Sequence, residues 1–238
     1  GVNWSSDKRP AIATSSVASE NLFTRRREMN HFKEFIENRF NGRISEGAHE
    51  PDSIGCALEV WSKYEGRRWT DDPTKLEMPD LRPLNDGPWS SDLARTTALV
   101  PVLVAVAPVW RDLNKREAWV RTIALETIRQ ILPIGLRARG LTTEARRCEA
   151  VANLVEAAKA AEAAAGAAWA ARAAEAAKAA EAAAAAAEAT ATAAVAAWAA
   201  AAAAARAARA AREGAGAVLL LACQIWVDAA ESMRGKSK

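Results

Sequence analysis

The chain has 238 residues, with 32 basic and 29 acidic side chains and a net charge of +3. This length suits one large domain or two small ones. So small a basic excess argues against a nucleic-acid-binding protein, which usually carries a concentrated basic patch. Three widely separated cysteines, Cys56, Cys148 and Cys223, indicate a reducing compartment. We therefore expect a cytoplasmic protein with no cofactor and no membrane span.

The N-terminal region predicts a single long helix. Residues 1–18 are polar and rich in serine, so we expect a disordered segment. A helix is predicted over residues 19–40, with Ser19 as its N-cap and the turn-forming pair Asn41-Gly42 as its stop signal.

A loop and a kinked helix are predicted next. We expect a short helix over residues 54–64, and the Gly-, Pro- and Asp-rich segment 65–90 predicts an ordered loop with brief turns. Ser91 and its neighbours can cap the helix that follows. Pro101 should kink or divide that helix, because proline removes a backbone donor.

The clearest helical pattern covers residues 114–132, where apolar residues recur at helical spacing. Pro133 and Gly135 are expected to end this helix. Another helix begins near Thr142 or Thr143 and is expected to run directly into the alanine-rich segment.

Residues 151–213 are mostly alanine, the residue with the highest helix propensity. Charges of alternating sign three residues apart, as at Glu156, Lys159 and Glu162, add to helix stability. A step of three residues turns an α-helix by about 300°, so these charges wind around the helix and leave no fixed apolar seam. We expect a long helix, either straight or folded back as a hairpin.

Together these elements predict an all-α protein in four parts. A disordered segment (1–18) precedes a helical domain with a long ordered loop (19–150). The alanine-rich low-complexity helix (151–213) follows, and residues 214–238 form a C-terminal apolar helix with a basic tail.

The polar residues in and around the long loop are the candidates for a functional site. A histidine beside a cysteine can activate a thiolate nucleophile, with a carboxylate or amide to orient the imidazole. Neighbouring aspartates can bind a hard cation such as Mg²⁺. The same residue types also form ordinary turns, and a buried cysteine acts as a small hydrophobe. The candidate catalytic residues are His49, Cys56, Glu59, Asp71, Asn85 and Asp86, and whether they hold a metal is left open.

Three stretches, "GAHEPDSIGCALEVWSKYEGRRWTDDP", "LRPLNDGPWSSDLARTTALVPVL" and "WVRTIALETIRQILPIGLRARGL", resemble a group of uncharacterised proteins from actinobacteria and their phages. The resemblance covers residues 42–145, and alanine-rich tails also follow this region in the group. The matching positions are Gly47, His49, Cys56, Glu59, Trp69, Asp71, Pro73, Asn85, Asp86, Pro101 and Gly140. The related proteins often have a cysteine after the Asp-x-Pro string, where this chain has "TKLEMPDL" with none. The resemblance implies a fold unit and no particular activity.

Two classes of function follow from these observations. The first is a non-enzymatic interaction or structural module of a bacterial or phage genome, with a protein partner or a second copy bound through the alanine-rich helix. The second is a small hydrolase or metal-dependent enzyme that uses the six candidate residues. An ice-binding helix would need a regular threonine row, which Thr190 and Thr192 alone do not make. The alanine-rich segment could also be a neutral product of triplet-repeat expansion.

Overall fold

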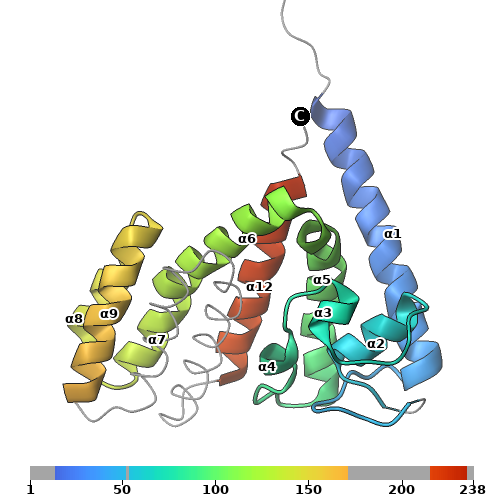
Figure 1. Ribbon diagram of the computed structural model, residues 1–238, viewed down its shortest axis with the longest axis horizontal. Coiled ribbons are helices and arrows are strands. Elements are labelled where there is room, and N and C mark those ends of the chain that lie inside the picture. Colours follow the sequence, from blue (N-terminus) through green and yellow to red (C-terminus); the bar gives the residue numbers. More distant parts are fainter. Residues whose placement is uncertain (1–13, 52–53, 171–214, 235–238) are drawn as a thin grey trace, which may run out of the picture.

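The protein is all-α in the residues that the computed structural model describes, which are 14–51, 54–170 and 215–234 (Figure 1). No strand occurs in these ranges, which confirms the predicted fold class. The helices are α1 (Thr14–Phe40), α2 (Ala57–Tyr64), α3 (Pro73–Leu76), α4 (Arg82–Asn85), α5 (Asp92–Arg111), α6 (Leu113–Glu126), α7 (Leu132–Arg137), α8 (Thr142–Glu149), α9 (Leu154–Ala170) and α12 (Ala215–Arg234), and a π-helical turn, η1 (Thr127–Ile131), joins α6 to α7.

α1 lies at the edge of the molecule and begins earlier than predicted (Figure 1). Its first residue is Thr14, so Ser19 lies inside the helix and is not its N-cap. The segment 14–18 contains no glycine or proline that would break a helix. The predicted stop at Asn41-Gly42 is confirmed, because both residues have positive φ angles, 51° and 72°. Residues 1–13 lie outside the described residues.

α5 and α12 form the centre of the main core. Figure 1 shows α12 packed between α6 and α5, so the predicted C-terminal apolar helix is present and packs on its own domain. Trp119 of α6 donates its buried indole N–H to the carbonyl of Trp226 of α12 at 3.1 Å. Their rings meet edge to face, with centroids 5.0 Å apart. These contacts fix α12 against α6.

α5 continues through two prolines without a break. Pro101 does not divide this helix, because α5 is a single helix of 20 residues, and a kink at Pro101 stays a prediction. Pro108 has no N–H and leaves the Val104 carbonyl without its helical donor. Arg234, in the last turn of α12, donates to that carbonyl from Nη2 at 2.9 Å. A tertiary hydrogen bond from Arg234 therefore replaces the helical hydrogen bond that Pro108 cannot donate.

By length and composition, α5 and residues 216–234 of α12 could each cross a membrane. Both helices are mostly buried against the rest of the protein, as core helices also are. That the chain has no membrane span stays a prediction.

The helix that begins at Leu113 does not end at Pro133, contrary to the prediction. The turn η1 intervenes, and the N–H of Leu132 bonds to the carbonyl of Thr127, five residues back. This shift in register places Pro133 in the first turn of α7, where a missing N–H costs little. The helical path then continues to Arg137.

α8 and α9 form a second core with η1 and α7. The predicted continuous helix into the alanine-rich segment is broken at residues 150–153, because Asn153 accepts from the N–H of Glu156 at 3.0 Å and caps α9. That the alanine-rich segment lacks the apolar seam of a heptad coiled coil stays a prediction, although part of residues 154–170 is buried within the chain. A buried face packs against α8 there and consists of Ala157, Ala161, Ala164 and Ala165. The path of the segment over 171–213 lies outside the described residues.

Candidate functional site

The loop between α1 and α2 is closed on itself by backbone contacts. The N–H of Ser45 donates to the carbonyl of Gly55 at 2.9 Å, which brings the two ends of the loop together. The N–H of Ile44 donates to the hydroxyl of Thr96 on α5 at 2.7 Å. The loop therefore has a fixed position before its polar side chains are considered.

Glu59 lies at the third position of α2 and is almost fully buried. Its Oε1 accepts from the N–H of His49 at 2.8 Å, and its Oε2 accepts from the N–H of Cys56 at 2.8 Å. The His49 Nδ1 atom lies 3.1 Å from the same Oε2. Glu59 thus caps α2 and holds the loop at His49.

Asn85 makes the second connection, from the end of α4. Its Oδ1 accepts from the N–H of Ala57 at 3.0 Å, and its Nδ2 donates to the Ser45 carbonyl and to Asp86 Oδ1, each at 2.8 Å. The same Asp86 oxygen accepts from the N–H of Gly47 at 2.8 Å. Asn85 and Asp86 together fasten the loop and the start of α2 to α4.

Arg95 of α5 is a buried cation that sequence reasoning missed. Its Nε donates to the Asn85 carbonyl at 2.7 Å, and its guanidinium contacts Asp92 and lies 3.3 Å from Glu46. The available signal was an arginine three residues after Asp92, at the start of an otherwise apolar helix. A buried arginine of this kind needs several acceptors, and the loop, the end of α4 and α5 itself supply them.

The thiol of Cys56 is buried at the N-cap of α2. Burial, the largest effect, raises the pKa of this thiol to about 12, although a hydrogen bond from the backbone N–H of Glu59 acts to lower it. The thiol is therefore protonated at neutral pH, and a protonated thiol is a poor nucleophile.

Asp71 and Asp72 take no part in the hydrogen bonds that Glu59 and Asn85 make around the loop, which we call the network. Asp72 is the N-cap of α3, and it accepts from the N–H of Thr74 at 3.0 Å and from its hydroxyl at 2.6 Å. These bonds, with Lys75 beside them, lower the pKa of Asp72 to about 2. Asp71 is half-buried and makes no hydrogen bond to the other five candidates in the part of the chain that the structure describes.

The structure therefore brings five of the six predicted residues together around the loop and leaves Asp71 apart. Among the described residues, no three His, Cys, Asp or Glu side chains are grouped so that they could hold a metal ion. Whether the five act in catalysis stays a prediction.

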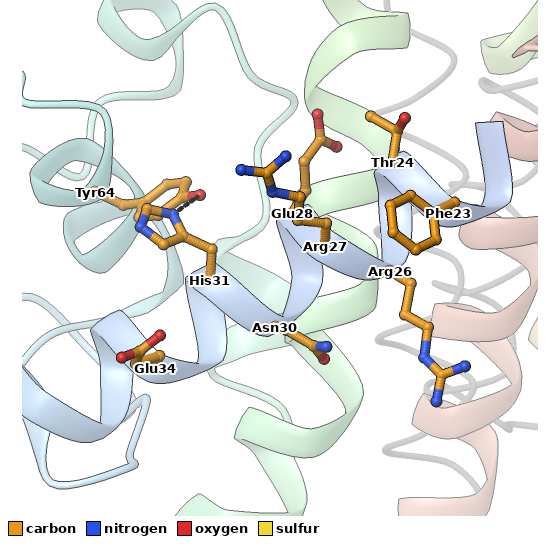
Figure 2. A pocket seen from close by; sticks show the side chains of 9 residues that line it. All are labelled: Phe23, Thr24, Arg26, Arg27, Glu28, Asn30, His31, Glu34 and Tyr64. Atoms are coloured by element: carbon orange, nitrogen blue, oxygen red, sulfur yellow. Dashed lines mark hydrogen bonds between the residues drawn. The ribbon is translucent and has the colours of Figure 1, made fainter. Parts of the chain in front are cut away.

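An open hollow lies elsewhere, on α1 and the end of α2 (Figure 2). It has a volume of about 830 Å³, and its lining includes Phe23 and Glu34 of α1 and Tyr64 of α2. Tyr64 is tied to α1, because its hydroxyl lies 3.1 Å from Nδ1 of His31. Burial, with Glu28 and Glu65 nearby, raises the pKa of Tyr64.

Comparison with protein-family models, with curated proteins and with solved structures gives no significant match to the chain.

Proposed function

We propose that the chain is a non-enzymatic interaction module of a bacterial or phage genome that acts in the cytoplasm. One observation carries the proposal: the polar side-chain atoms of Glu59 and Asn85 are all hydrogen-bonded within the chain, mostly to backbone groups. These two side chains therefore build the loop and leave no polar atom of their own for a substrate.

The alternative, a hydrolase with a Cys–His nucleophile, has less support from the same geometry. The carboxylate of Glu59 and the ring of His49 are paired as in a catalytic triad, at 3.1 Å. The thiol that they would activate is buried at the start of α2, with a pKa of about 12. A catalytic cysteine needs an accessible, electropositive setting that lowers its pKa.

Reactivity of the thiol separates these two functions. We expect Cys56 of the folded, full-length chain to resist iodoacetamide at neutral pH as fully as the buried Cys223, and both to react once urea unfolds the protein. Peptide mass spectrometry gives the modified fraction of each cysteine. Rapid modification of Cys56 alone in the folded chain would overturn the non-enzymatic assignment.

The hollow on α1 is the surface that we assign to a protein partner. Phe23 stands at its edge with 74% of its area exposed, and exposed aromatic side chains of this kind are common in interfaces. A photo-crosslinking residue at position 23, in cells that express the full chain, should yield a defined protein adduct. Leu113 of α6, 68% exposed, is the matched control position and should yield none. Equal crosslinking at both positions, or none at either, contradicts the proposal.

A further inference from the structure

α1 carries an exposed row of side chains on the side opposite its core-facing residues. The members recur at alternating spacings of four and three, which places them on one helix face. We call this the outer row, and it consists of Phe23, Arg27, Asn30, Glu34 and Glu37. The opposite face of α1 holds the buried residues Phe32, Ile36 and Phe40. The outer row is therefore not part of the core of its own chain.

The charges of the outer row are separated along the helix. The basic side chain, Arg27, lies towards the N-terminus, next to the exposed Arg26, and the acidic side chains, Glu34 and Glu37, lie towards the C-terminus. Within the described part of the chain, neither Arg27 nor Glu34 forms an ion pair. Figure 2 shows Phe23 and Arg26 at one end of the hollow and Glu34 at the other.

We propose that the outer row binds the outer row of a second copy of this chain, with the two α1 helices antiparallel about a twofold axis. The inference rests on the proposed function and names the partner of the same surface. When the axis passes between residues 30 and 31, Arg27 of each chain faces Glu34 of the other. A parallel arrangement would instead place Arg27 beside Arg27, so charge complementarity selects the antiparallel one.

The position of α1 leaves room for this arrangement. α1 lies at the edge of the molecule, with α5 and α2 on its other side (Figure 1). From Phe23 to Glu37 the row is about 21 Å long at 1.5 Å per residue, which is enough for several turns of a second helix to pack beside it. The hollow lies along this row, and side chains of the second helix would occupy it.

A charge exchange tests the proposal in the full-length chain. Sedimentation equilibrium over about a hundredfold range of concentration should show a monomer–dimer equilibrium for the natural sequence. Arg27→Glu and Glu34→Arg should each raise the dissociation constant by about ten- to thirtyfold, since twofold symmetry turns two attractions into two repulsions. The double variant should return the constant to near its original value.

A control pair and a folding readout keep the result interpretable. Arg121→Glu and Glu117→Arg on α6 exchange an exposed ion pair far from α1 in sequence, and should leave association unchanged. Circular dichroism should show the same helix content in every variant. Self-association is overturned if the natural sequence stays monomeric at all concentrations. It is also overturned if the dissociation constant of the double variant is as high as those of the single variants. If position 23 then crosslinks to a different protein, the interaction function stands and its partner is not this chain.

Discussion

The carboxylate of Glu59 provides the sharpest test of how the loop is built. Glutamine at this position keeps the shape of the side chain but replaces one acceptor oxygen by a donor. In either orientation the amide NH₂ faces a backbone N–H, of His49 or of Cys56, that then has no acceptor. A buried donor without a partner costs about 1–3 kcal/mol, and the remaining bonds lose the strength that a charged acceptor gives. We expect Glu59→Gln to lower the free energy of unfolding by about 2–4 kcal/mol.

Urea unfolding followed by far-ultraviolet circular dichroism measures this change. Glu117→Gln on α6 is the matched control, because the Glu117 side chain is 58% exposed and should change stability by less than about 0.5 kcal/mol. If Glu59→Gln were no more destabilising than this control, the carboxylate would not hold the loop. The claim that the polar residues are structural would then lose its main support.

Three further changes probe how α12 is held. Gly87→Ala would place a Cβ atom 2.8 Å from a methyl group of Leu219, so we expect a loss of about 1–3 kcal/mol in urea unfolding. Gly216→Ala, within α12, meets no atom within 4 Å and should instead stabilise by up to about 1 kcal/mol; a loss there would contradict the helix assignment. Arg234→Met leaves the Val104 carbonyl without its donor and should cost about 1–2 kcal/mol, with faster amide hydrogen exchange in the last turn of α12. Unchanged exchange in that turn would show that the arginine does not hold the helix end.

The fold could be predicted from the sequence where local chemistry decides it. The stop signal at Asn41-Gly42 and the apolar helix near the C-terminus both follow from residue types, and both are present. Pro133 does not end the helical path, because a π turn absorbs its effect, and Pro101 does not divide α5. The break before α9 was not predicted, because Asn153 was not recognised as a helix cap next to the long alanine run.

The candidate site, like the fold, was predictable from the sequence only where the contact is local. The spacing of Cys56 and Glu59 is three residues, which suffices for a capping box at a helix start. The contact between Asn85 and Ala57 joins residues 28 positions apart, and no periodicity in the sequence could reveal it. The role of Arg95 likewise depends on Glu46, which lies 49 positions away in the loop and meets Arg95 only in the folded chain.

The resemblance to actinobacterial and phage proteins stays a prediction, and the network supplies a physical reason for the residues that carry it. Trp69, one of its matching positions, donates its indole N–H to the carbonyl of His49 at 2.9 Å, so it joins the same loop as Glu59 and Asn85. A string of residues that are far apart in sequence yet meet in one hydrogen-bond network is what a shared fold requires. Such residues would recur in proteins with the same loop whatever each protein binds. On this reasoning, a partner is recognised by surfaces outside the motif, and in this chain the outer row of α1 is the surface that we propose.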